Sequence, residues 1–237
     1  MRLISNLIFA TITFTLLGGF GIQNLEAATP EEICTVSTFH GGMLVVNGSE
    51  DMALLESLNK KGFTVQVLVN DEVKLQSLRA ALSAKKFNGA ITAKYFDGKN
   101  LPYVENLINV YVDFSDSAKL NSSEIKRILT PRGVHLSVRG DSLKKVFNKP
   151  VPSTIDDWPM HRYGPSNNPV SNDEDVAPPR HIQWHAGPEW TRSHELVSSL
   201  NAMISNKGRV FYVMDEGPRA SATLTPDWTL VCRDAFN

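Results

Sequence analysis

The stretch from residue 42 to residue 138 alternates short runs of β-branched residues with segments of helical period. This alternation is typical of βαβ units, in which crossover helices join parallel strands. The expected strands are residues 43–47, 64–69, 91–95, 107–112 and 133–138. The expected helices are residues 51–61, 71–85 and 122–129. The sequence therefore predicts an α/β fold, a parallel sheet with flanking helices.

Two of the expected helices carry local signals of their own. Helix 71–85 places its apolar residues largely on one face, and these are Val73, Leu75, Leu78 and Leu82. Helix 122–129 has Ser122 or Ser123 available as its N-cap.

Charge argues against two classes of partner. Lys and Arg total 24 against 25 Asp and Glu, which gives a formal net charge of −1. A nearly neutral chain offers no sequence-wide attraction for nucleic acid or for an anionic membrane. We therefore expect no nucleic-acid partner.

The N-terminus has the form of an export signal. Arg2 precedes an apolar run over residues 3–22, and small or aliphatic residues at 25–27 suit a signal peptidase. An uncleaved anchor is the alternative, since the run approaches the ~20 residues needed to span a bilayer, but its glycines favour cleavage after Ala27. Residues 1–27 are thus predicted to be a signal peptide. The mature protein is expected to be periplasmic or secreted, with no stable membrane insertion after cleavage.

Two cysteines, Cys34 and Cys232, lie near opposite ends of the mature chain. An oxidising compartment would let them pair if their Cα atoms came within disulfide range. Two free thiols are the simpler expectation, and the spacing matches no metal or redox motif.

The amino-acid composition of the chain changes after Lys149. Residues 150–180 are rich in Pro, Asn, Ser and Asp and indicate an extended linker. Short strands are then expected at residues 202–205, 209–214 and 228–233, with Asn206, Lys207 and Gly208 forming a three-residue hairpin loop. The expected divisions are residues 34–149, 150–180 and 181–237.

A family resemblance covers residues 44–138. It is carried by residues 44–48 (LVVNG), 96–103 (FDGKNLPY) and 124–133 (EIKRILTPRG). The last segment looks like the family's Arg-x-Leu-x-Pro-Gly-Gly motif, in which residues 131–133 are expected to form a turn. In this order the three segments resemble the class I S-adenosylmethionine-dependent methyltransferases. The resemblance implies a Rossmann-like sheet, and it implies S-adenosylmethionine as the cofactor if the pocket is functional.

Three residues would bind that cofactor by the same resemblance. Gly48 stands in the glycine turn after the first strand, and Asp97 would contact the adenine amino group. The family's acidic ligand of the ribose is missing at the end of the second strand, and Asp71, two residues later, is its candidate substitute.

The sequence departs from the family pattern at three positions, and these are Glu50, Met52 and Val69. Glu50 and Met52 stand where the family has glycines, so their side chains are expected to crowd the pocket. Glu50 would also place a negative charge near the cofactor carboxylate. Val69 replaces the acidic ribose ligand. The pocket is therefore predicted to be degenerate.

The C-terminal part resembles the start of a pyrroloquinoline-quinone (PQQ)-type β-propeller. The resemblance is carried by residues 166–168 (SNN), 178–184 (PPRHIQW), 208–212 (GRVFY) and 230–237 (LVCRDAFN). A propeller closes with about four to eight blades, and residues 181–237 correspond to an incomplete propeller segment of roughly one blade. Quinone binding is not expected from this segment alone.

A metal site is not expected among the C-terminal histidines, which are His161, His181, His185 and His194. His181 and His185 would share one face of a helix, but the neighbouring Gly187 and Pro188 favour extended structure.

Three functions remain open from the sequence. The leading prediction is an exported bacterial protein with a degenerate, non-catalytic methyltransferase-like domain and a partial PQQ-like propeller. Its expected role is binding or structural, in the cell envelope, with an envelope protein as its partner. The second is an active S-adenosylmethionine-dependent methyltransferase. The third is a fragment of a quinoprotein oxidoreductase.

Overall fold

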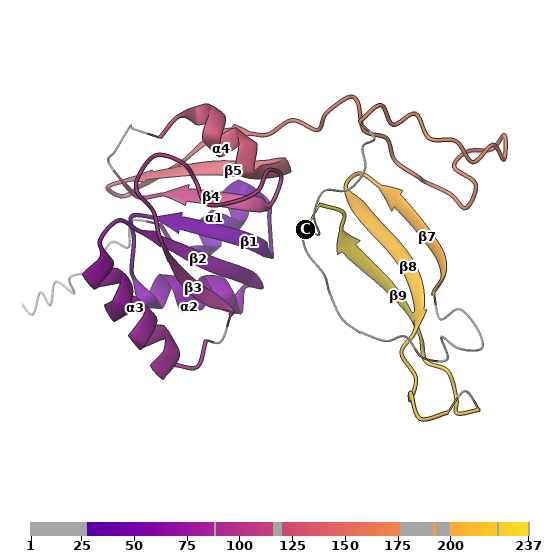
Figure 1. Cartoon of the computed structure of the whole chain (residues 1–237). Helices are drawn as coiled ribbons and strands as arrows, with labels where there is room; N and C mark the ends of the chain where they lie inside the picture. The colour runs from indigo at the N-terminus through magenta and orange to yellow at the C-terminus, as the bar shows by residue number, and fades with distance from the viewer. Residues whose placement is uncertain are drawn as a thin grey trace, which may run out of the picture.

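The computed structural model describes residues 28–87, 89–115, 120–175, 192, 200–221 and 223–236. These residues form a six-stranded sheet with four helices and a separate three-stranded sheet (Figure 1). The predicted signal peptide lies outside the described residues. Within the described ranges, no helix has the length and apolar character that crossing a bilayer requires.

The large sheet has the strand order β3-β2-β1-β4-β5-β6. Its members are β1 (Gly42–Asn47), β2 (Phe63–Val69), β3 (Ile91–Tyr95), β4 (Ile108–Asp113), β5 (Leu129–Arg139) and β6 (Ser142–Asn148). Strands β1 to β5 pair in parallel, and β6 pairs antiparallel to β5. This is the order of a doubly wound Rossmann sheet. The predicted α/β, Rossmann-like fold is confirmed.

Two apolar cores lie on the two faces of this sheet. The helices α1 (Pro30–Ser37), α2 (Met52–Lys60) and α3 (Glu72–Ala84) contribute to the first core, together with one side of the strands. The helix α4 (Ser122–Ile128) and the connection from β3 to β4 cover the other face. Crossover helices on both sides explain why β1 and β4 contain runs of buried residues and do not alternate between buried and exposed ones.

The helices begin at polar caps. Asp51 caps α2 by accepting a hydrogen bond from the amide of Ala53. The N-cap of α4 is Asn121, whose Oδ1 accepts from the amide of Ser123 at 3.0 Å. The predicted cap at Ser122 or Ser123 was therefore wrong, because the helix begins one residue earlier than its serines suggest.

Helix α3 presents a narrower apolar face than predicted. Leu75, Leu78 and Leu82 are buried, whereas Val73 is 77% exposed. Val73 precedes Leu75 by two residues, which is about 200° around a helix of 3.6 residues per turn. Its side chain therefore points away from the core.

Two elements were not predicted. Helix α1 has Pro30 at its first position and a capping box, in which Thr29 and Glu32 each accept the other's backbone amide. Strand β6 lies at the sheet edge and is mostly exposed, with adjacent lysines Lys144 and Lys145. The lysines break the alternation that would mark a strand, although charge on an edge strand discourages unwanted pairing.

Residues 131–133, predicted as a turn, lie inside β5. The strand is irregular there, since the β4–β5 register shifts between Ile108 and Val110 and Arg132 has a φ of 69°. A Cβ on Gly133 would lie 2.9 Å from the carbonyl oxygen of Ile108. The glycine is needed for this close approach of strands, not for a separate turn.

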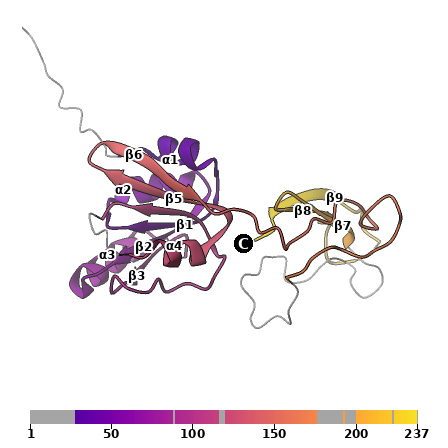
Figure 2. The same ribbon diagram turned by 90° about the horizontal axis from the view of Figure 1, so that it is seen from above.

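The small sheet is antiparallel, with the order β7-β8-β9 (Figure 2). Its strands are β7 (Leu200–Asn206), β8 (Arg209–Asp215) and β9 (Trp228–Asp234). The β7–β8 loop contains two residues, not the predicted three, because Asn206 pairs with Arg209. Lys207 and Gly208 both have positive φ, at 50° and 73°, as a type I′ turn requires. That the three-stranded sheet is a propeller blade stays a prediction.

One buried ion pair fixes the β8–β9 connection. Arg192 Nη1 lies 2.6 Å from Asp215 Oδ2, and the two side chains are only 3% and 9% exposed. Arg192 Nε also donates to the carbonyl of Pro218, while Asp215 Oδ1 accepts the amides of Gly217 and Asp227. The cysteines do not pair: Cys34 is buried and Cys232 is exposed, each as a free thiol.

We expect a fragment of residues 28–152 to fold alone with one cooperative thermal transition, because both cores of the large sheet lie within it. It retains Lys149, whose Nζ donates to Asn106 Oδ1 at 2.6 Å and to the Leu129 carbonyl at 2.7 Å.

A fragment of residues 150–237 is expected to aggregate, since Trp228 and Leu230 are 50% and 70% exposed on the edge strand β9. Circular dichroism melts and light scattering test both; a soluble, sharply melting second fragment would contradict the expectation.

Candidate functional site

The candidate site is the carboxyl edge of the large sheet. In open α/β sheets, ligands bind beyond the carboxyl ends of the strands, where the strand order reverses. Here the reversal falls between β1 and β4. Gly48, Asp71 and Asp97 follow β1, β2 and β3, which are neighbours in the sheet, so the strand order places all three along this edge.

Gly48 is in contact with the segment that follows β4. Its φ is 83°, and a Cβ built there would lie 2.9 Å from the amide nitrogen of Ser115 and 3.0 Å from its Cβ. Only glycine takes this backbone conformation without strain. A side chain at position 48 would therefore collide with Ser115, although the glycine itself is exposed.

Both aspartates make local hydrogen bonds to the backbone. Asp71 caps α3 and accepts from the amide of Lys74 at 2.9 Å. Asp97 is exposed and accepts from the amide of Lys99, also at 2.9 Å. Val69, which stands at the ribose position of the resemblance, is only 2% exposed and packs in the core. The ribose position is therefore apolar.

The expected crowding of the pocket by Glu50 and Met52 was wrong for Met52. As the first residue of α2, Met52 packs against the core beneath α1 to α3. Glu50 is exposed. The segment that meets the glycine turn contains Ser115 instead.

Four polar residues form what we call the edge cluster: Asn47, Asp113, Ser115 and Arg139. Asp113 Oδ1 accepts from Asn47 Nδ2 at 3.1 Å, from the Ser115 amide at 3.0 Å and from the Ser115 hydroxyl at 2.6 Å. Asp113 Oδ2 accepts from Arg139 Nη2 at 3.2 Å. Asp113 is only 9% exposed, so the cluster satisfies a nearly buried carboxylate at the point where the strand order reverses.

The sequence contained a signal for this cluster. Asn47 and Asp113 are each the polar last residue of a mostly apolar strand, β4 also containing Asn109. Parallel neighbouring strands bring such residues together, and β1 and β4 pair Asn47 directly with Asp113. Finding the cluster required knowing that β1 and β4 are neighbours.

Three buried polar side chains lie on the α4 side of the sheet. Tyr103 Oη, Tyr111 Oη and both ring nitrogens of His135 have no hydrogen-bond partner within the described part of the chain. The His135 ring stands edge-on to Tyr111 and to Phe147, with centroids 5.5 and 5.4 Å away. Burial raises the pKa of both tyrosines. Burial lowers the pKa of His135, which Asp113 opposes and Arg139 reinforces.

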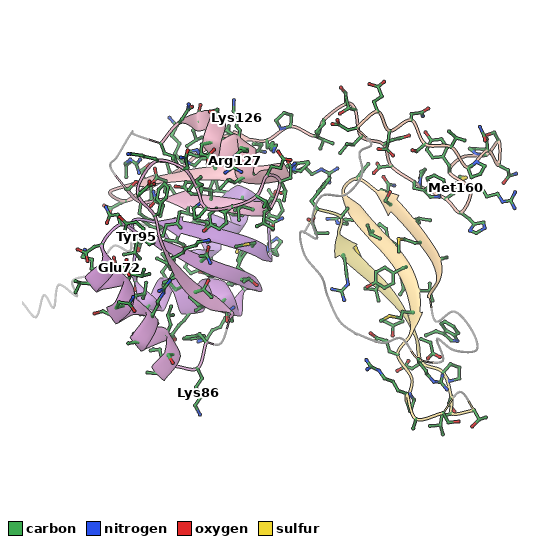
Figure 3. All side chains as sticks on the ribbon, viewed as in Figure 1. Glu72, Lys86, Tyr95, Lys126, Arg127 and Met160 are labelled. Atoms are coloured by element: carbon green, nitrogen blue, oxygen red, sulfur yellow. The ribbon has the colours of Figure 1, made fainter. Side chains whose placement is uncertain are left out.

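Helix α4 holds the connection that carries Asp97. Arg127 and Glu124 form an ion pair of 2.7 Å, and Figure 3 shows Arg127 on this helix. Arg127 donates to the carbonyls of Tyr103 and Leu101 at 2.7 and 3.1 Å, while Glu124 accepts the Leu101 amide at 2.8 Å. The connection is thus fixed at both sides of Pro102.

Neither a metal site nor the cavity beside His40 adds to the candidate site at the carboxyl edge. Among them, no three His, Cys, Asp or Glu side chains are grouped to hold a metal; His181, His185 and His194 lie outside the described ranges. One cavity of about 480 Å³ is lined by residues such as His40, Arg132 and Phe236. It contains no residue of the edge cluster.

No family model matches the sequence, and neither does any curated protein sequence. Several solved structures are similar to this chain. One, from Methanococcus maripaludis, is described as an S-adenosyl-L-methionine-dependent methyltransferase. It is 21% identical in sequence with a TM-score of 0.41, and the match covers 46% of this chain and 52% of that one. Geranyl diphosphate C-methyltransferase from Streptomyces coelicolor A3(2), in complex with Mg²⁺, geranyl diphosphate and S-adenosyl-L-homocysteine, has 11% identity and a TM-score of 0.41 over 46% and 43% of the two chains.

This chain thus spans about half the length of the solved structures it matches. Their identities and TM-scores are too low to transfer a function. The Rossmann-like assignment rests on the strand order of this chain.

We expect Gly48→Ala to destabilise the protein more than Gly98→Ala. Both glycines have left-handed φ values, 83° and 82°, so each alanine costs about 1–2 kcal/mol of backbone strain. Only at Gly48 would the new Cβ meet Ser115, whereas nothing lies within 4 Å of the one at Gly98. Urea unfolding measures both variants, and equal losses of unfolding free energy would show that a side chain at position 48 does not collide with Ser115.

We also expect an acid-dependent loss of stability from His135. Its pKa is lowered in the folded state, so its contribution is complete above the unfolded value of about 6.5 and is lost as the pH falls through that value toward the folded one. His135→Phe should reduce the loss of unfolding free energy between about pH 7 and pH 5. The matched control, substitution of the exposed His40 by Phe, should retain it. Identical pH profiles for His135→Phe and the unaltered protein would contradict this assignment.

Proposed function

We propose that this chain is an exported protein whose methyltransferase-like domain is degenerate and non-catalytic and acts as a binding or structural module in the cell envelope, followed by a partial PQQ-like propeller. The observation that carries the proposal is the hydrogen bonding within the chain at the carboxyl edge. Ser115 lies next to Gly48, and the edge cluster occupies the end of β1 and β4, between which the strand order reverses. A ligand entering there would have to displace hydrogen bonds that satisfy a nearly buried carboxylate.

The residues present do not fit S-adenosylmethionine in the position that the resemblance implies. The ribose hydroxyls need an acceptor, and Val69 supplies only apolar surface. Asp71, the stand-in, already caps α3 through Lys74. Breaking that cap would cost about 1 kcal/mol, so cofactor binding would compete with the fold. The exposed carboxylate of Glu50 adds like charge beside a cofactor carboxylate.

Export and the propeller enter this proposal from the sequence. The signal-like residues 1–27 support a periplasmic or secreted location, where S-adenosylmethionine, a cytosolic metabolite, is scarce. The antiparallel β7-β8-β9 sheet supports a blade-like segment. An envelope protein is the partner that this location implies. The active methyltransferase and the quinoprotein fragment remain alternatives, and the first is tested directly below.

Isothermal titration of the full chain with S-adenosylmethionine tests the proposal. We expect no binding heat and no shift in Tm, whereas a functional site would stabilise the fold by about 2.7 kcal/mol at a ligand concentration 100-fold above Kd. Asp71→Asn removes the carboxylate that would stand in for the ribose ligand but keeps a good N-cap for α3, and it serves as a companion variant. It should give the same flat titration as the unaltered protein. Micromolar affinity of the unaltered protein would overturn the proposal and make the methyltransferase the better reading.

A further inference from the structure

The outer edge of β3 is open. Within the described strands β3 pairs only with β2. The Ala90 carbonyl accepts from Val65 and the Phe96 amide donates to Val69, both at 2.9 Å. Because successive residues of a strand alternate in direction, the even-numbered residues of β3 face β2. The backbone groups of Ala93 and Tyr95 therefore point outward.

A groove runs between this edge and α3. It has a volume of about 280 Å³ and apolar lining from Leu82, Phe87 and Ile91, with Arg79 at its rim. Arg79 Nε donates to the carbonyl of Ala93 at 3.2 Å. That bond already supplies a donor to one outward carbonyl of the edge, and Ala93 is only 8% exposed, so an added strand would share this acceptor with Arg79 or displace it.

The edge carries few of the features that prevent strand addition, which include proline, bulges and charge along the strand. Strand β3 contains no proline and pairs with β2 in unbroken register. Its one charged residue, Lys94, turns to the α4 side of the sheet, where Nζ donates to the Pro102 carbonyl at 3.3 Å. Tyr95 is 47% exposed at the end of the strand, and Figure 3 shows it beside the start of α3.

The positive charge of Arg79 favours an acidic partner at the β3 edge. Arg79 forms no ion pair within the described part of the chain. An acidic side chain placed over the groove would therefore gain a cationic partner. A second copy of this chain, paired edge to edge about a twofold axis, would instead bring like-charged arginines toward one another.

We propose that the outer edge of β3 binds an extended, acidic peptide segment of a partner protein as an added strand. The peptide backbone pairs with Ala93 and Tyr95, one apolar side chain enters the groove at Leu82 and Phe87, and a carboxylate contacts Arg79. Main-chain pairing supplies affinity in this mode, and pockets for alternate side chains supply specificity. The inference names the partner surface for the proposed binding role and does not depend on whether the carboxyl edge admits a cofactor.

A displayed library of random ten-residue peptides, selected on the full chain, tests this surface. We expect enrichment of sequences that alternate apolar residues and carry Asp or Glu. The best peptide, made synthetically, should bind with micromolar to submillimolar Kd and shift the amide resonances of Ala93 and Tyr95. A library that yields no binder, or binders that shift only other amides, would overturn the proposal.

Two pairs of variants separate strand addition from simple adhesion. Tyr95→Pro removes an outward amide and leaves the β2 pairing intact, so it should weaken peptide binding about tenfold, the equivalent of one main-chain hydrogen bond. Tyr95→Ala keeps that amide and should change Kd less than Tyr95→Pro does. Arg79→Glu should abolish the preference for acidic peptides, while Arg79→Lys should retain it.

The thermal transition of each variant must match that of the unaltered protein, which excludes misfolding as the cause. Equal binding by Tyr95→Pro and Tyr95→Ala would reject strand addition. A self-association that disappears in Tyr95→Pro would replace the peptide partner with a second copy. Failure of these tests leaves the cofactor titration unaffected, and binding of S-adenosylmethionine would leave these tests unaffected, so the two proposals fail separately.

Discussion

The burial of β1 on both faces is the constraint on which the rest of the structure depends. Leu44, Val45 and Val46 have no exposed surface, and their side chains enter the two cores alternately. A strand buried in this way needs neighbours on both edges and cover on both faces. Strands β2 and β4 supply the neighbours, and α1 to α3 and α4 supply the cover. Polar chemistry is thereby confined to the strand end, at Asn47.

The edge cluster follows from that confinement. A carboxylate as enclosed as that of Asp113 must be paired or hydrogen-bonded, because leaving it unpaired away from water is costly. Asn47, Ser115 and Arg139 meet this requirement from three separate segments. The same bonds that stabilise the end of the sheet also occupy the region where related architectures place a ligand.

The two ends of the strand order have different properties. Strand β6 closes one side with exposed lysines, whereas β3 leaves outward backbone groups beside an apolar groove. The carboxyl edge is hydrogen-bonded within the chain at the edge cluster, while β3 is regular and pairs with β2 alone among the described strands. A Rossmann-like framework thus presents a regular backbone edge beside an apolar groove at a place separate from its carboxyl edge. The framework alone does not decide function, which resides in particular side chains.

The sequence by itself determined the elements whose patterns are local: the strands β1 to β4, most of β5, and the helices α2 to α4 follow from periodicity within short windows. It also placed Gly48, Asp71 and Asp97 after successive strands. Tertiary structure decided what depends on distant neighbours: the edge strand β6, the irregular β5 at Arg132, and the contact of Ser115 with Gly48. Asn47 and Asp113 are 66 residues apart, and no local window contains both. Their hydrogen bond exists only because burial of β1 brings β4 alongside it.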